Sequence, residues 1–165
     1  MASASAIPVA DDPVPATEDS KADEKLRVES RFGTIEFQRD KVITFTHGML
    51  GFPAHLEFAI AELPGEIYGH FKLLQSVSDG EVAFPVLPLE TLPGLIKDED
   101  IKEALQILSI PLEHAVVLLI ATARKDQDRV QLSVNLRAPI FLNAETRSGR
   151  QLVLSNNEYP IRHML

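Results

Sequence analysis

Residues 130–143 show the clearest alternation of hydrophobic and polar positions in the chain. Over the first half of this segment every second residue is apolar, and the residues between are polar. The apolar positions are Val130, Leu132, Val134 and Leu136. A period of two is typical of a β-strand with one buried face. An apolar run resumes at Ile140, and we expect a bend or bulge at Pro139 because proline has no N–H for a sheet hydrogen bond.

Residues 115–123 form an unbroken apolar run just upstream, with β-branched residues near its centre. Such a run predicts a strand that is covered on both faces. Residues 124–129 are polar and charged, so we expect them to be the turn between this strand and the next. Together these segments predict the middle of one antiparallel sheet.

Shorter alternations predict further strands around this centre. They lie at residues 28–37, 42–45, 57–63, 71–77, 81–86 and 151–154. The first of these segments predicts a hairpin, with Gly33 free to adopt a positive φ at its turn. The strand at residues 81–86 contains Pro85, which predicts a position towards an edge of the sheet. Turn residues at 75–80 predict that the two flanking strands form a hairpin.

One helix is predicted near residues 98–108. Three acidic residues stand at its start, where the helix dipole favours negative charge, and Asp98 is the expected N-cap. One face carries Ile101, Leu105 and Leu108, and Pro111 would end the helix. About ten short strands and a single helix predict an all-β, mainly antiparallel fold, either a small β-barrel or a sandwich.

A tight turn is predicted from Gly48 to Phe52, because two glycines lie within four residues. Phe52 is a large apolar residue placed on this turn. It either fills the end of the core or is displayed to a partner. Burial at the end of the core is the stronger expectation for a phenylalanine.

The composition suits one globular domain, since 45% of the 165 residues are hydrophobic. Residues 1–25 differ, because they are rich in Ala, Ser, Pro, Asp and Glu. We expect them to be a disordered acidic tail, followed by a single domain at residues 26–165. There is no cysteine, no secretory signal and no apolar run near the roughly 20 residues of a membrane span. We therefore expect a cytoplasmic protein with no membrane partner.

Charge and candidate chemistry favour protein partners over nucleic acid and catalysis. A net charge of −8 repels a phosphate backbone, so direct nucleic-acid binding is not expected. The five histidines lack metal-site spacing, and there is no glycine-rich phosphate loop and no nucleophile elbow. We expect no cofactor and no enzymatic activity, which leaves a binding module. The residues leave open a small β-barrel enzyme or ligand-binding domain, and an RNA-binding barrel.

Four stretches, in order along the chain, resemble one known family. The first is the turn from Gly48 to Phe52. The others are residues 74–79 with 83–86, residues 135–143, and residues 149–154 with Tyr159. Over about residues 26–165 the chain resembles the flagellar assembly factor FliW family. It differs at Leu50, where many family members carry proline before the second glycine of the turn.

The resemblance implies a β-barrel-like fold without catalysis. Family members bind newly made flagellin in the cytoplasm, and they also bind and antagonise the RNA-binding translational repressor CsrA. The two partners compete in effect, so accumulating flagellin frees the repressor, which stops flagellin synthesis. The expected partners are therefore flagellin and CsrA. A groove for an amphipathic helix is the expected binding mode.

Ten residues are candidates for the site, in two groups. The candidates for partner contact are Phe52, Gln75, Asn135, Arg137 and Asn143. The candidate fold determinants are Gly48, Gly51, Ala138, Pro139 and Gly149. Asn135 and Arg137 are the stronger contact candidates, because they lie on the strand face opposite the core. Phe52 joins them if its ring is exposed, because aromatic anchors dominate interface energies.

Overall fold

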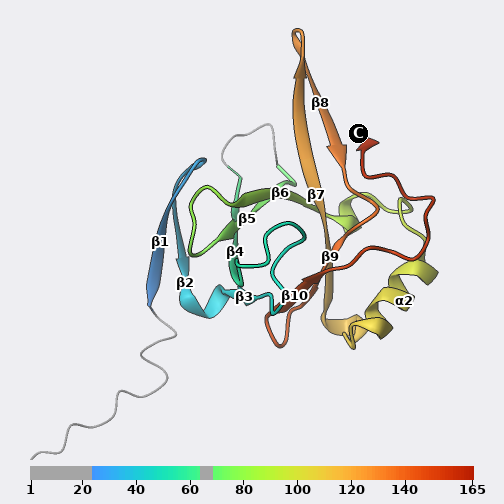
Figure 1. Ribbon diagram of the computed structural model, residues 1–165, viewed down its shortest axis with the longest axis horizontal. Coiled ribbons are helices and arrows are strands. Elements are labelled where there is room, and N and C mark those ends of the chain that lie inside the picture. Colours follow the sequence, from blue (N-terminus) through green and yellow to red (C-terminus); the bar gives the residue numbers. More distant parts are fainter. Residues whose placement is uncertain (1–23, 64–68) are drawn as a thin grey trace, which may run out of the picture.

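The computed structural model describes residues 24–63 and 69–165 (Figure 1). The expected tail lies outside these residues, apart from Glu24 and Lys25. The backbone N–H of Arg39 donates to the Glu24 carbonyl at 2.9 Å, and its Nε pairs with the Glu24 carboxylate at 3.0 Å. Lys25 is the first residue of the first strand. No described helix is long and apolar enough to cross a membrane.

The described residues form eleven strands, one α-helix and three 3-10 turns. The strands are β1 (Lys25–Ser30), β2 (Gly33–Gln38), β3 (Ile43–Thr44), β4 (Glu57–Glu62), β5 (Lys72–Ser76), β6 (Ala83–Pro88), β7 (Ala115–Asp126), β8 (Arg129–Val134), β9 (Ile140–Asn143), β10 (Ser148–Gln151) and β11 (His163–Met164). The helical elements are η1 (Arg39–Lys41), η3 (Leu89–Thr91), α2 (Asp98–Ile107) and η4 (Leu112–His114). The predicted fold class, mostly β with one α-helix, is confirmed.

Seven of the described strands close into a barrel. In order around the ring they are β7, β6, β5, β4, β3, β10 and β9, and β9 returns to pair with β7. Every pairing in the ring is antiparallel except β3 with β10, which is parallel. Closure pairs edges that an open sheet would leave exposed.

Within the barrel, strands β5 and β9 are buried on both faces, which suits the successive apolar residues that they carry. Inward side chains fill the barrel interior, where Phe45, Phe58 and Ile140 are fully buried. The β1–β2 hairpin covers the outside of β4 and β5 with Ile35 and Phe37. Helix α2 and the C-terminal segment cover β6, β7 and β9 on another side (Figure 1). The sheet therefore has one core inside the barrel and two outside it.

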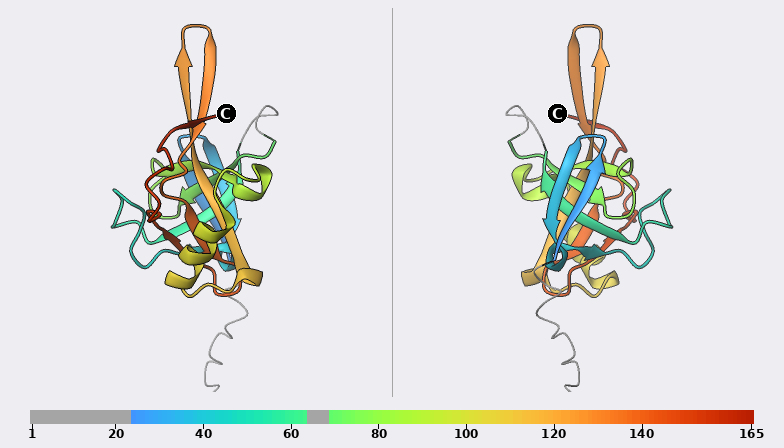
Figure 2. Two further views of the ribbon diagram at one scale, coloured as in Figure 1. Left: turned by 90° about the vertical axis from the view of Figure 1, so that its right-hand side faces the viewer. Right: turned by 90° about the vertical axis from the view of Figure 1, so that its left-hand side faces the viewer.

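Strand β7 changes partners along its length. Residues 115–118 pair with β9, and residues 118–120 pair with β6, so this half belongs to the barrel. Residues 121–126 pair only with β8 among the described strands. This second half and β8 form a hairpin that projects well beyond the barrel, while β11 pairs with the outer edge of β8 at its base (Figures 1 and 2).

The projecting hairpin corrects the prediction of a polar turn at residues 124–129. The strands run to Asp126 and resume at Arg129, so only two residues form the turn, Gln127 and Asp128. Gln127 has a φ of 51°, as short hairpin loops require. Charged residues here lie on strands because the hairpin stands in solvent on both faces.

The apolar alternation of residues 130–136 is buried at one end only. Val134 and Leu136 are buried, Leu132 is half-buried, and Val130 is 59% exposed. The predicted double coverage of residues 115–123 likewise holds at the centre of β7, around Leu118, and fails at its ends. The reason is the same in both cases: the strands extend past the elements that would cover them.

Strand β6 lies inside the ring, so the prediction that Pro85 marks an edge strand is wrong. Pro85 pairs in register with Leu73 of β5. It precedes Val86, which is the first residue of β6 that pairs with β7. A residue without an N–H is tolerated at this point because the β7 side of the strand is still unpaired.

Two boundaries also differ from the predictions. Lys97 is the N-cap of α2 in place of Asp98, and Ser109, at a φ of 55°, ends the helical path before Pro111. The last long hairpin strand is Ser148–Gln151 rather than residues 151–154, because pairing with β9 starts where Ser148 meets Asn143.

Candidate protein-binding site

A wedge-shaped cleft opens where β6 and β7 diverge. Its walls are residues 82–85 on one side and residues 120–123 on the other, and its volume is about 620 Å³. The β1–β2 turn contributes Arg31 and Phe32 to the lining, and Phe52 also lines the cleft. The polar side chains in the lining are Arg31, Glu81 and Thr122, so the cleft is mainly apolar.

Phe52 is 38% exposed, so the prediction that it fills the end of the core is wrong. Its ring packs edge-on against Phe84 at 5.2 Å between centroids, and it lies 6.1 Å from the His55 ring. Met49, in the same turn, is only 2% exposed and takes the core position. The turn therefore buries one apolar residue and displays the other.

The two glycines of this turn have different constraints. Gly48 has a φ of 64°, and a Cβ there would lie 2.5 Å from the Phe52 carbonyl oxygen. Gly51 has a φ of 85° with open space around it. Gly48 is thus required by conformation and by close packing, whereas Gly51 is required by conformation alone. Both glycines belong to the turn that carries Phe52.

The apolar lining continues from the cleft onto the projecting hairpin. A second hollow of about 300 Å³ shares Phe32, Pro85, Ala121 and Ala123 with the cleft. Its other lining residues are Leu63, Phe71 and Leu132. The two hollows form one continuous surface from Phe52 to the hairpin, which we call the apolar groove.

Asn135 and Arg137 lie at the joint between β8 and β9 and are half-buried. Asn135 Oδ1 accepts the backbone N–H groups of Arg137 and Ala138, at 3.0 and 3.1 Å. The Arg137 guanidinium donates to the carbonyls of Tyr159 and Asn157, at 2.9 and 2.8 Å. These contacts bend the chain into β9 and fasten the C-terminal segment to it.

Gln75 and Asn143 are buried, at 0% and 8% exposure. Gln75 Nε2 lies within hydrogen-bond distance of four carbonyls in the following loop, those of Ser76, Asp79, Gly80 and Val82. Asn143 Oδ1 accepts the N–H groups of Glu145 and Thr146 in the β9–β10 turn. In the free protein both amides therefore satisfy loop backbone.

Ala138 and Pro139 lie in the packed joint between β8 and β9, and Gly149 lies in barrel strand β10. Ala138 is 5% exposed, and Pro139 is buried and accepts the Leu152 N–H at 3.1 Å. A Cβ on Gly149 would lie 2.5 Å from the Phe45 ring, so a larger residue would displace the barrel interior.

Sequence reasoning missed Gln151, which links two of these regions. Its Nε2 donates to the Ala138 carbonyl at 3.1 Å, and its Oε1 accepts the Leu50 N–H at 3.0 Å. This side chain therefore ties the Gly48–Phe52 turn to the joint. Its position one residue before an apolar run carried no signal of that role.

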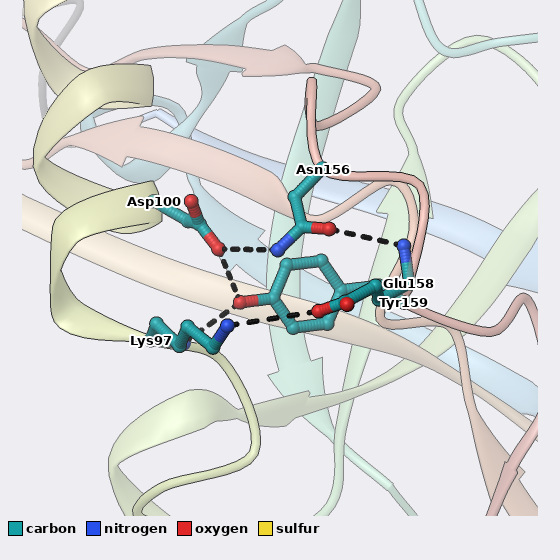
Figure 3. Close-up of polar contacts among 5 residues, drawn as sticks. All are labelled: Lys97, Asp100, Asn156, Glu158 and Tyr159. Carbon is teal, nitrogen blue, oxygen red and sulfur yellow. Dashed lines mark hydrogen bonds and ion pairs between the residues drawn. The ribbon is translucent and has the colours of Figure 1, made fainter.

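A polar cluster joins α2 to the C-terminal segment (Figure 3). The Tyr159 hydroxyl donates to the Asp100 carboxylate and accepts the Lys97 N–H at 2.9 Å. Asn156 Nδ2 also donates to Asp100, at 3.1 Å, and Lys97 Nζ lies 3.6 Å from the Glu158 carboxylate. The cluster holds the C-terminal segment against α2, because its members point at one another (Figure 3).

The pKa values of Asp100 and Tyr159 favour the hydrogen bond between them. The Tyr159 hydroxyl, and then the Asn156 amide, hold the pKa of Asp100 below its ordinary value of 3.8. Burial, and then the bond to Asp100, raises the pKa of Tyr159 above 10.0. Asp100 thus stays ionised and Tyr159 stays neutral at physiological pH. Among residues 24–63 and 69–165, no three histidine, aspartate or glutamate side chains group as metal ligands.

Comparisons with known proteins agree with this architecture. A family profile described as "FliW protein" matches residues 27–165. A protein named flagellar assembly factor FliW from Clostridium botulinum is 36% identical over 137 residues, covering 81% of this chain and 92% of that protein. One of the same name from Bdellovibrio bacteriovorus is 33% identical over 133 residues, covering 81% of this chain and 74% of its own length.

A solved structure also matches, described as the crystal structure of the flagellar assembly factor FliW. It superposes with a TM-score of 0.68 at 27% identity, covering 84% of this chain and 95% of that chain. The class is therefore that of flagellar assembly factors, which is not a known class of enzymes. The chain belongs to the FliW family.

Proposed function

We propose that this chain is a cytoplasmic chaperone of flagellin that also binds and antagonises the translational repressor CsrA. The observation that carries the proposal is membership of a flagellar assembly family across residues 27–165, joined to an exposed apolar groove. Coupling of flagellin supply to flagellin translation then needs only mass action between two ligands of one domain.

The groove suits a chaperone because it is open and mainly apolar. The apolar helical ends of a flagellin need cover before export, and an amphipathic helix is a ligand that such grooves accept. Phe52 supplies an aromatic ring to the lining of the groove, and exposed aromatic rings are frequent interface anchors. The net charge of −8 favours encounter with a basic, RNA-binding partner.

Titration of the purified chain with flagellin and with CsrA from the same cell tests the proposal. We expect a stoichiometric complex with each, and we expect added flagellin to release CsrA. Failure of both partners to bind at tens of micromolar would contradict the proposal. Binding of flagellin alone would restrict it to the chaperone role.

Phe52→Ala tests the groove in that complex. We expect affinity for flagellin to fall by about 1–3 kcal/mol, in the range of an aromatic interface anchor. Leu112→Ala is the matched control, because Leu112 is 65% exposed in η4, at the barrel end of β7. Equal affinities for the two variants would place the flagellin site elsewhere.

A further inference from the structure

The second half of β7 has one free edge. Residues 121–126 pair with β8 on one side, and no described strand pairs with them on the other side. The pairing of β7 with β6 stops at Ile120, where the cleft begins. Unpaired strand edges expose rows of backbone donors and acceptors that can template another strand.

The backbone groups on that edge can be identified from the hydrogen bonds. The Ile120 carbonyl accepts the Asn135 N–H at 2.9 Å, so the backbone of Ile120 faces the β8–β9 side. Successive residues of an antiparallel strand direct their backbone groups to opposite edges. The backbone groups of Ala121, Ala123 and Lys125 therefore face the free edge, and those of Thr122 and Arg124 face β8.

The β6 side of the cleft is already occupied. Arg31 Nη2 donates to the Ala83 carbonyl at 2.9 Å, and Pro85 has no N–H to offer. An added strand would thus take its hydrogen bonds from β7 and not from β6. An added strand could therefore pair with the edge of β7 only, and would not bridge β6 and β7.

The side chains on the same half of β7 form a matching surface. Ala121, Ala123 and Leu132 line the smaller hollow, so one face of the hairpin is apolar. Val130 pairs with Lys125 two residues further out and is 59% exposed on that face. An added strand with apolar residues at alternate positions would extend this face and bury it.

The charges at the free edge indicate which kind of strand would bind there. Arg124 and Lys125 are exposed and adjacent, in a chain whose net charge is −8. A second copy paired edge to edge about Arg124 and Lys125 would bring this basic pair close to its own counterpart, and like charges in neighbouring positions destabilise a sheet. Carboxylates in these positions of a peptide would instead be attracted.

We propose that the free edge of β7 binds an extended segment of a partner protein by strand addition. That segment alternates apolar residues on one face and carries carboxylates opposite Arg124 and Lys125. The inference goes beyond the proposed function, because it defines a surface and a binding mode that hold even if flagellin binds elsewhere.

The probe is a capped seven-residue peptide with two glutamates followed by alternating valine and threonine. Added antiparallel, it places its glutamates opposite Lys125 and Arg124 and its first two valines opposite Ala123 and Ala121. We expect saturable amide shifts in the NMR spectrum of the full chain at up to about 1 mM peptide. We also expect slower hydrogen exchange at Ala123 and Lys125 on binding, with Arg124 already protected by β8.

N-methylated peptides provide the decisive control. Methylation of the amides that face β7 should weaken binding by about three- to tenfold per N–H removed, whereas methylation of the alternate amides should leave it unchanged. Equal binding of the two methylated peptides would overturn strand addition. Absence of binding by the unmodified peptide would overturn it as well.

Charge-reversal variants test the selection of the occupant. Lys125→Glu should weaken binding of the acidic peptide by about threefold or more. The same variant should strengthen binding of the peptide that has lysines in place of glutamates. Arg129→Glu is the matched control, because it makes the same change on β8 at the far side of the hairpin. A dimer in solution whose Ala123 and Lys125 amides are already protected would overturn the proposal, since a second copy would then occupy the edge.

Discussion

Leu119 and Ala123 lie four residues apart on one side of β7, in opposite surroundings. Leu119 is completely buried between the barrel wall and the covering layer of α2, and Ala123 is exposed on the projecting hairpin. The strand continues through both without a break. The difference shows that neighbouring elements, and not the strand's own residues, decide where apolar side chains become core and where they remain available for binding.

The largest expected effect lies in the barrel half of the strand. Leu119→Ala should lower the free energy of unfolding by about 2–5 kcal/mol, because it removes buried methyl groups and leaves a cavity. Urea denaturation monitored by circular dichroism measures the change. A loss below about 1 kcal/mol would mean that the outer core at α2 relaxes to fill the space.

The second largest effect on stability is expected at the joint between β8 and β9. Asn135→Ala removes the acceptor for two backbone N–H groups at the bend into β9, so we expect a loss of about 1–3 kcal/mol in stability. Asn135→Asp keeps an oxygen acceptor and serves as the control. If partner affinity falls while the melting temperature of Asn135→Ala is unchanged, Asn135 is a contact residue and not a structural one.

The polar cluster that holds the C-terminal segment against α2 should contribute less to stability. Tyr159→Phe removes the hydroxyl that links Asp100 to Lys97, and we expect a loss of about 1 kcal/mol at neutral pH. Thermal unfolding of the variant beside the parent chain measures it. Asn156→Ala removes the other donor to Asp100 and should produce a smaller loss.

The pH dependence of that loss follows from the pKa shifts. The pKa of Asp100 lies below 3.8 in the folded protein, so its contribution is present above that pH and disappears as pH falls through the lowered value. The pKa of Tyr159 is raised above 10.0, so its contribution disappears as pH rises through the raised value. The difference between Tyr159→Phe and the parent chain should therefore shrink below about pH 4. A difference that stayed constant down to pH 2 would contradict the role of the Asp100 bond.

The smallest effect is expected on the exposed half of the hairpin. Val130→Ala should change stability by no more than about 0.5 kcal/mol, because the side chain is 59% exposed. The comparison becomes sharper if the same variant weakens binding of the extended peptide. A large loss of stability would show instead that Val130 is covered in solution.

The site was only partly predictable from the sequence. The turn at Gly48 could be located from its glycines, and the resemblance drew attention to Phe84 and Pro85 as part of a spaced stretch. The cleft itself could not be predicted, because it depends on β6 and β7 diverging after one short pairing. Gln151 was missed because its two bonds reach residues 13 and 101 positions away.

The sequence by itself determined the local elements, since the period of two and the turn residues act over a few neighbouring positions. It predicted most of the described strands, helix α2 and the hairpin turn at Gly33. Only the tertiary structure decided that β9 returns to β7 to close a barrel, that Pro85 lies in an interior strand, and that Val130 is exposed. Those outcomes depend on contacts between distant segments, where the burial of one residue is set by whichever element packs beside it.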